Sequence, residues 1–154
     1  MNNLLLFGAG RSSLYLIEYL QKWCVENNTS LLICDKDILY AKKQITNQVS
    51  IAFQELDIFD QNKVEPLVGK CRMVISLLPA ALHIHIAKLC LKHHKNLGTA
   101  SYISDEMKAL SEEAKEKNLI FLNECGLDPG IDHMSAMQMM DSIKAEGGVI
   151  NSFE

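Results

Sequence analysis

The chain has 154 residues, a formal net charge of -4 and a pI near 5.7. Its length predicts about one domain, and 48% hydrophobic with 22% charged residues is typical of a packed globular protein. The acidic balance argues against a nucleic-acid partner, and no apolar run approaches the roughly 18 residues of a membrane span. Because the N-terminus also lacks a signal-peptide pattern, we expect a cytoplasmic protein.

Cysteine usage agrees with that location. The five cysteines are odd in number and form no Cys-x-x-Cys pair. Most of them lie in apolar runs, so we expect buried free thiols in a reducing compartment. Cys125 lies instead in a loop, where no neighbouring base supports a role as nucleophile.

Apolar runs begin near residues 3, 31, 50, 73, 96 and 119, and helical periodicity fills most of the intervals. These intervals are too long for hairpins and are typical of βα units. The sequence therefore predicts an α/β fold, a doubly wound parallel sheet with helices on both faces. In such folds, ligands bind beyond the carboxyl ends of the strands.

The first of these ends carries a glycine-rich loop between an apolar run and a helical pattern. The loop comprises Gly8, Ala9, Gly10, Arg11, Ser12 and Ser13. Gly8 permits a tight turn, and Gly10 lets the backbone approach a pyrophosphate. Ser13 replaces the third glycine of a dinucleotide fingerprint: it is small enough for close helix packing, and its hydroxyl can donate to phosphate. We expect Gly10 to Ser13 to hold the pyrophosphate.

Asp35 ends the second apolar run and is placed to accept hydrogen bonds from a ribose. Its charge would repel a 2′-phosphate, which favours NAD. The neighbouring lysines, at positions 36, 42 and 43, keep NADP open. The alternative is that Asp35 and Asp37 simply begin a helix.

The residues that follow the third and fourth predicted strands complete the expected cofactor side of the crevice. Asp57, followed by Ile58, can meet the adenine end or cap the helix near residue 60. The turn at Leu78 and Pro79 is stiffened by proline and would lie along the nicotinamide, although Pro79 also stops the strand by itself. His83 follows on a helix; it lies near the crevice, or else in the core or solvent. His83 and His85 fall on opposite sides of that helix, so we predict no joint metal site.

The segment after the fifth predicted strand, residues 99–104, places three hydroxyls before a helix that Ser104 can cap. Ser101 and Tyr102 have the hydrogen-bonding capacity to hold a carboxylate or amine, or they tie the loop to its own backbone.

The segment after the sixth predicted strand, residues 123–133, contains both turn-forming and ionisable residues. Gly126, Pro129 and Gly130 predict a rigid turn. Asp128, Asp132 and His133 would then face the crevice, unless Asp132 merely caps the next helix. His133 and His83 are the candidates for proton transfer, and no general acid is identified with assurance.

The C-terminal region predicts a helix over residues 132–145 and a strand starting at 149–153 without a partner. Its methionines, at positions 134, 137, 139 and 140, and Ile143 make the helix apolar on more than one side, as expected if it packs between the sheet and an absent element. We expect residues 1–132 to form an NAD(P)-binding domain and 133–154 to begin a truncated substrate domain. The same apolar surface predicts a homodimer.

With these residues in view, the chain resembles the saccharopine dehydrogenase family, in particular the glutamate-forming saccharopine reductases. The resemblance covers nearly the whole chain and rests on the Gly8 loop, residues 76–79 with His83, residues 99–107 and residues 123–133. It implies a Rossmann domain, a separate substrate domain and an amino-acid substrate of lysine metabolism. Hydride would pass between a nicotinamide and the imine that joins glutamate to 2-aminoadipate 6-semialdehyde, with the present chain inactive alone.

The resemblance also implies residue roles. Residues expected to line the cofactor are Gly10 to Ser13, Asp35, Asp57, Leu78, Pro79, Ala100, Ser101, Leu127, Asp128 and Pro129. Ser101 and Tyr102 would reach the substrate. Glutamate-forming members commonly use NADP and carry a basic residue near position 35, from which this sequence departs.

Three alternatives remain open. The chain could belong to a related amine-forming reductase of the carboxynorspermidine or homospermidine type, distinguishable by its amine and aldehyde substrates. It could be a regulatory nucleotide-sensing domain, which has no need of the loop at residues 127–133. A bare interaction module would bind no nucleotide.

Overall fold

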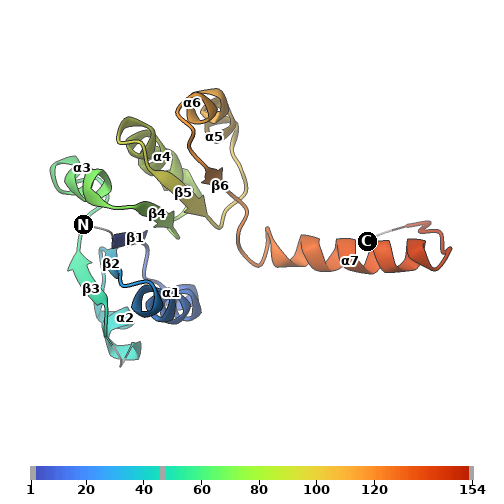
Figure 1. Ribbon diagram of the computed structural model, residues 1–154, viewed down its shortest axis with the longest axis horizontal. Coiled ribbons are helices and arrows are strands. Elements are labelled where there is room, and N and C mark those ends of the chain that lie inside the picture. Colours follow the sequence, from blue (N-terminus) through green and yellow to red (C-terminus); the bar gives the residue numbers. More distant parts are fainter. Residues whose placement is uncertain (1–2, 46–47, 153–154) are drawn as a thin grey trace.

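The computed structural model describes residues 3–45 and 48–152, which form a six-stranded, all-parallel sheet in the order β3-β2-β1-β4-β5-β6 (Figure 1). The strands are β1 (Asn3–Phe7), β2 (Ser30–Asp35), β3 (Ile51–Glu55), β4 (Met73–Ser76), β5 (Asn96–Thr99) and β6 (Phe121–Leu122). This is the strand order of the Rossmann fold. The predicted doubly wound sheet is confirmed, with each strand starting within two residues of its expected position.

Helices fill the intervals between the strands. They are α1 (Leu14–Glu26), α2 (Leu39–Gln44), α3 (Gln61–Lys70), α4 (His83–Lys92), α5 (Asp105–Ala109), α6 (Ser111–Glu116) and α7 (Ile131–Ala145). Two short 3-10 turns, η1 (Arg11–Ser13) and η2 (Ala80–Leu82), precede α1 and α4. None of the helices in the described part of the chain has both the length and the apolar character needed to cross a bilayer.

The central strand β1 is buried on both faces. Leu4 and Leu6 join one apolar cluster with side chains of α1 and α2, whereas Leu5 and Phe7 join another with side chains of α3 and α4. Two-sided burial explains why β1 reads as a continuous apolar run rather than an alternating one. Each of these side chains contributes about 1.5–3 kcal/mol relative to an exposed position.

The connections from β1 and β4 leave the sheet in opposite directions, so a crevice opens between them. Leu77 donates a backbone hydrogen bond to Phe7 at 2.8 Å and keeps the two strand ends together. Gly8, just beyond β1, has φ +99°, and a Cβ there would lie 2.8 Å from the Leu77 carbonyl carbon and oxygen. Only glycine fits this crossing point.

Helix α7 departs from expectation. It projects away from the body, and none of its residues is buried (Figure 1). The expectation that its methionines pack against the sheet is therefore wrong: Met134 is 67% and Met139 66% exposed. The helix begins directly after a turn in which Gly126 and Gly130 form an isolated bridge. Residues 149–152 pair with no strand in the described part of the chain, and residues 153–154 lie outside that part, so the predicted strand start stays a prediction.

We expect Gly8→Ala to lower the free energy of unfolding by about 1–3 kcal/mol, because the added Cβ meets backbone at a positive φ. Gly10→Ala is the matched control: its φ is -72°, and no heavy atom lies within 4 Å of an added Cβ. That variant should stay within about 1 kcal/mol of wild type. Urea unfolding measures both, and equal stability of the two variants would contradict the close packing at Gly8.

Candidate functional site

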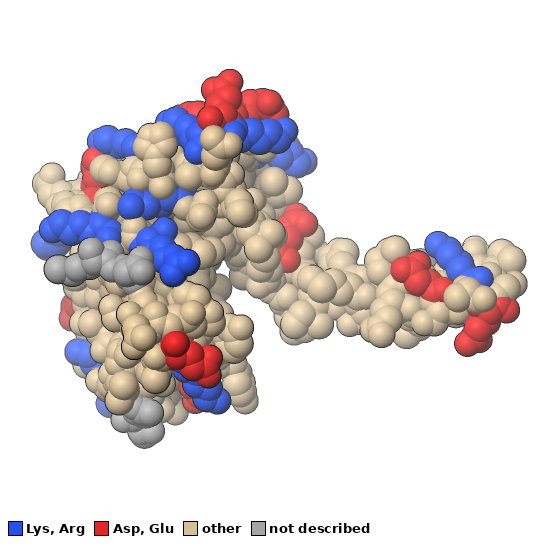
Figure 2. Space-filling model, in the orientation of Figure 1, with Lys and Arg blue, Asp and Glu red and all other residues tan. Residues whose placement is uncertain are grey.

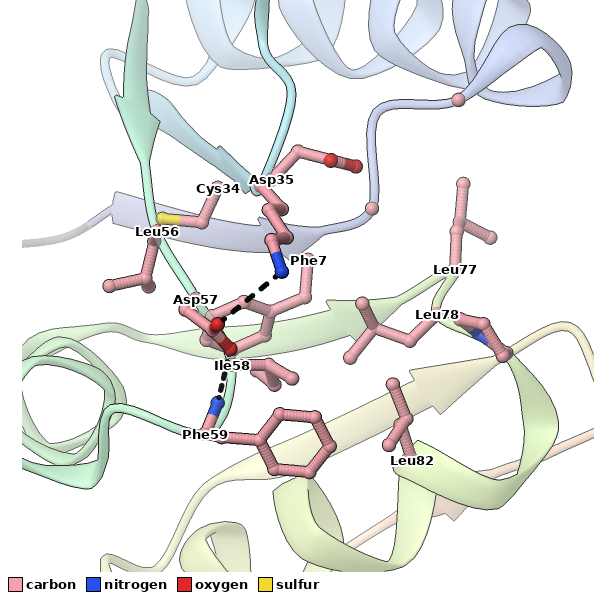
Figure 3. Close-up of a pocket in the computed structure, with 14 residues that line it drawn as sticks. Phe7, Cys34, Asp35, Leu56, Asp57, Ile58, Phe59, Leu77, Leu78 and Leu82 are labelled. Carbon is pink, nitrogen blue, oxygen red and sulfur yellow. Dashed lines mark hydrogen bonds and ion pairs between the residues drawn. The ribbon is translucent and has the colours of Figure 1, made fainter.

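A pocket of about 420 Å³ opens at the carboxyl ends of β1 to β4 (Figure 3). It is lined by Phe7, Gly8, Gly10, Cys34, Asp35, Lys36, Leu56, Asp57, Ile58, Phe59, Leu77, Leu78, Pro79 and Leu82. The structure thus brings together seven residues expected at the cofactor: Gly8, Gly10, Asp35, Asp57, Ile58, Leu78 and Pro79. The pocket lies at the switch point of the sheet, where ligands of doubly wound folds bind.

The glycine-rich loop is open where a ligand would approach. Gly10 lines the pocket, and the space beside its Cα is empty within 4 Å. A phosphate group can therefore come close to the backbone at the start of η1 and α1. Arg11 and Ser12 are exposed beside this opening but do not line the pocket.

Ser13 has a different role from the one proposed for its hydroxyl. The side chain is buried, and its Oγ donates to the Gly10 carbonyl at 2.7 Å. Because the hydroxyl proton already has this partner, Ser13 closes the turn rather than pointing at a phosphate. Its small size still allows the helix to pack close to the sheet, as the sequence predicted.

Asp35 ends β2 at the pocket wall and ties the glycine-rich loop to the strand. Its Oδ2 accepts from the Ala9 amide at 2.6 Å, and its Oδ1 accepts from Asp37 N at 2.8 Å. The helix-start alternative applies to Asp37, whose Oδ1 accepts from Leu39 N at 3.0 Å. Asp35 itself is therefore a fixed carboxylate beside the loop.

Asp57 lies across the pocket from the loop (Figure 3). Its Oδ1 accepts from Phe59 N at 3.0 Å, and its Oδ2 lies 3.7 Å from Lys36 Nζ. Asp57 therefore stabilises the turn before α3, while Asp60 holds the helix N-cap position. The Lys36 side chain is 85% exposed, so its ion pair with Asp57 is loose and the lysine can turn to other anions.

His83 is buried, which is the core position that the sequence left open. Its Nδ1 lies 2.8 Å from Ser76 Oγ, and its Nε2 lies 2.8 Å from Ser101 Oγ. Burial lowers the pKa of His83, so the ring is neutral at pH 7. Ser76 belongs to residues 76–79, on which the resemblance partly rests, but no signal in the sequence assigned it a role of its own.

The remaining candidates lie at the neighbouring strand ends, outside this pocket. Tyr102 donates from its hydroxyl to Asp128 Oδ1 at 2.5 Å. This hydrogen bond and the nearby negative charges raise the pKa of Tyr102 to about 12. Leu127 is 72% exposed, and the peptide bond between Asp128 and Pro129 is cis.

Close backbone packing joins the loops after β5 and β6. A Cβ on Gly126 would lie 3.0 Å from the Ala100 carbonyl oxygen, and one on Gly130 would lie 2.2 Å from the Gly126 oxygen. Glu124, which the sequence did not single out, accepts from Ile103 N at 3.1 Å. Ser101, Tyr102 and Asp128 are therefore held in one unit.

His133 is exposed at the start of α7. Its Nδ1 lies 2.8 Å from Asp132 Oδ1, and this hydrogen bond raises the pKa of His133. Asp132 lies in the first turn of α7 and accepts from Gly130 N at 3.0 Å, while Gly130 itself holds the N-cap position. The ligating atoms of Asp128, Asp132 and His133 lie within 4.8 Å of one another, but all three side chains are exposed and already hydrogen-bonded. We assign them no metal.

All five cysteines are free, and Cys125 alone is exposed. Burial raises the pKa of Cys34 to about 12 and that of Cys71 to about 11, so these thiols stay protonated. The Cys125 thiol donates to the Asn123 carbonyl oxygen at 3.4 Å. A carbonyl oxygen is too weak a base to remove the thiol proton. The structure therefore supports no thiolate nucleophile.

Comparison with known proteins agrees with this geometry. The family model described as the saccharopine dehydrogenase NADP binding domain matches residues 4–122. Mitochondrial alpha-aminoadipic semialdehyde synthase of Mus musculus is 35% identical over 150 residues, which are 97% of this chain and 16% of that protein. Saccharopine dehydrogenase (NADP(+), L-glutamate-forming) of Schizosaccharomyces pombe is 33% identical over 99% of this chain and 33% of its own length.

A solved structure gives the same result. Apo histidine-tagged saccharopine dehydrogenase (L-Glu forming) from Saccharomyces cerevisiae superposes with a TM-score of 0.77 at 26% identity. The match covers 96% of this chain and 32% of that one. The chain thus spans no more than about a third of the length of these three proteins.

Proposed function

The chain belongs to the saccharopine dehydrogenase family, and we propose that it forms the nicotinamide-dinucleotide-binding part of such an oxidoreductase. The proposed reaction is hydride transfer between the nicotinamide and the imine or secondary amine that links glutamate to 2-aminoadipate 6-semialdehyde in lysine metabolism. The observation that carries the proposal is the pocket at the switch point, with an open backbone at Gly10. The domain limits predicted from the sequence, 1–132 and 133–154, belong to the same proposal.

The residues that line the pocket support this proposal. Gly10 and the start of η1 would face the pyrophosphate, and the fixed carboxylate of Asp35 would accept from ribose hydroxyls. Apolar side chains from the loops after β3 and β4, among them Ile58 and Leu78, would cover the rings. When bound, the nicotinamide supplies or accepts the hydride, whereas this chain orients it and excludes water.

The substrate side would lie at the ends of β5 and β6. Ser101 and Tyr102 would hold the carboxylate or amine of an amino-acid substrate. Proton transfer to a forming amine needs a group that titrates near neutrality. His83 is buried and bonded at both ring nitrogens, which leaves the exposed His133 as the remaining candidate.

We infer a cytoplasmic location from the free thiols, which persist in reducing compartments. The Mus musculus relative is named mitochondrial, so localisation by fluorescent fusion decides this point.

Gly10→Val should weaken NADH binding about 10- to 100-fold, because a branched side chain would occupy the space left for the pyrophosphate. Gly98→Ala, in β5, is the control, since its Cβ would make an ordinary 3.6 Å contact with Met73. Calorimetric titration measures both affinities. Unchanged NADH affinity in Gly10→Val would refute the assigned site.

Asp35 should favour NADH over NADPH by about tenfold, because a carboxylate accepts from a ribose diol and repels a 2′-phosphate. Asp35→Asn keeps an oxygen for the Ala9 amide but removes the charge, so the preference should largely vanish. Asp37→Asn is the matched control, because Asp37 accepts from Leu39 N just before α2 and does not line the pocket. Tighter binding of NADPH by the wild-type chain would show that Lys36 outweighs Asp35.

The chain alone should bind dinucleotide without oxidising saccharopine at an appreciable rate. Its two arginines are Arg11 and Arg72, and Arg72 lies 5.9 Å from the Trp23 ring, just before β4 begins. Arg72 thus lies at the opposite end of β4 from the crevice, and the four candidate loops at the carboxyl ends of the strands, from Asp57 to His133, offer no guanidinium to clamp substrate carboxylates. Absorbance of the reduced cofactor follows the reaction, with binding measured in the same preparation. Turnover comparable to a full-length relative would refute this expectation.

We also propose that α7 mediates self-association with a second copy of this chain. On the face that Figure 2 shows, the projecting helix carries few charged side chains between its first turn and its far end. Exposed apolar side chains on it include Ile131, Met134, Met137 and Met139. Such a surface favours burial against another protein.

Sedimentation velocity tests this proposal. A dimer is expected for wild type and a monomer for the double variant Met137→Glu and Met139→Glu, since charged groups resist burial. Gln138→Glu adds a charge to the same exposed helix and is the control. A monomeric wild-type chain at high protein concentration would contradict the proposal.

A further inference from the structure

A short chain of hydrogen bonds crosses the carboxyl edge of the sheet beside the pocket. It runs from Ser76, the last residue of β4, through the ring of His83 at the start of α4, to Ser101 in the loop after β5. Each link measures 2.8 Å. These hydrogen bonds therefore connect β4, which leads into the turn at Leu78 and Pro79, with the loop after β5, which is expected to meet the substrate.

The buried hydroxyl of Ser76 decides which groups donate and which accept in this series of hydrogen bonds. Ser76 is 0% exposed, and within residues 3–45 and 48–152 its Oγ has one hydrogen-bond partner, His83 Nδ1. A buried hydroxyl proton without an acceptor is costly, so Ser76 must donate to Nδ1. A neutral ring that accepts at Nδ1 carries its proton on Nε2. His83 then donates from Nε2 to Ser101 Oγ.

Ser101 consequently keeps its own hydroxyl proton for another group. Ser101 is half-buried, and in the described part of the chain its Oγ has no hydrogen-bond partner other than His83. The loop that carries it is fixed, because Ser101 O accepts from Glu124 N at 3.2 Å. The Ser101 hydroxyl is thus held at the carboxyl edge with its proton free to donate.

We propose that His83 is a positioning residue that presents Ser101 as a hydrogen-bond donor to an acceptor oxygen of the bound ligand. That oxygen belongs to a carboxamide or to a carboxylate, which are the acceptors of a nicotinamide and of an amino acid. The identity of the ligand rests on the proposed function, whereas the position of the ring proton does not.

The ring proton is tested first, without any ligand. Nitrogen-15 NMR of the imidazoles distinguishes the two neutral tautomers, and the spectrum of His83→Gln identifies the His83 signals. A proton on Nε2, with Nδ1 unprotonated, is expected. A proton on Nδ1 would mean that His83 donates to Ser76 and accepts from Ser101, which would overturn the proposal.

Ligand affinity tests the second part of the proposal, that Ser101 donates to the bound ligand. Removing a single donor should weaken binding about three- to tenfold. We therefore expect His83→Phe and Ser101→Ala each to lose that much ligand affinity, and His83→Gln to recover part of it, because its amide can donate to Ser101. His94→Asn is the matched control: His94 is exposed at the turn after α4, where φ is +53°, a conformation that asparagine tolerates.

Two ligands distinguish the acceptors. A loss for NADH but not for ADP-ribose, which lacks the nicotinamide, assigns Ser101 to the carboxamide. Unchanged NADH affinity with loss of saccharopine binding to the NADH complex assigns it to a carboxylate. Unchanged affinity for both ligands in Ser101→Ala overturns the ligand half of the proposal. A wild-type chain that binds neither ligand overturns the proposed function and this half together, while the NMR result still decides the tautomer.

Discussion

The close crossing of Gly8 over Leu77 is the constraint on which the site depends. The two connections leave neighbouring strands in opposite directions, and the backbone after β1 must pass the start of the β4 turn with no side chain between them. A positive φ and a missing Cβ are both needed, and glycine supplies both. Because the crossing is so tight, the loop can turn toward α1 at once and leave the pocket open on the other side.

Charge and burial divide the carboxyl edge into two parts with different chemistry. Beside the glycine-rich loop, Asp35 is held by two backbone amides, so its charge stays where a ribose would lie. Beyond β4, the edge is organised by neutral hydroxyls and a buried imidazole instead. A fixed anion suits discrimination between cofactors, whereas a neutral, directional hydrogen-bond chain suits the orientation of a ligand without a change of charge.

The loops after β5 and β6 behave as one body, which connects the substrate side to α7. Contacts between Gly126 and Ala100, and between Tyr102 and Asp128, join them. Helix α7 begins directly after the same turn, and its first residues include His133. Whatever covers the apolar surface of α7 would therefore also bear on the proposed proton donor.

The sequence by itself determined the sheet, its order of elements and the loops that form the pocket, because period, turn residues and strand-end carboxylates are local signals. It also predicted that Gly8, Gly10 and Asp35 lie together, and all three line the pocket. It could not show that Ser13 bonds back to Gly10, or that α7 stands clear of the sheet, since both depend on backbone direction over several residues. The partnership of Ser76, His83 and Ser101 was equally hidden. Three residues from different elements meet only when parallel strands bring their carboxyl ends to one edge, and that is decided by tertiary structure.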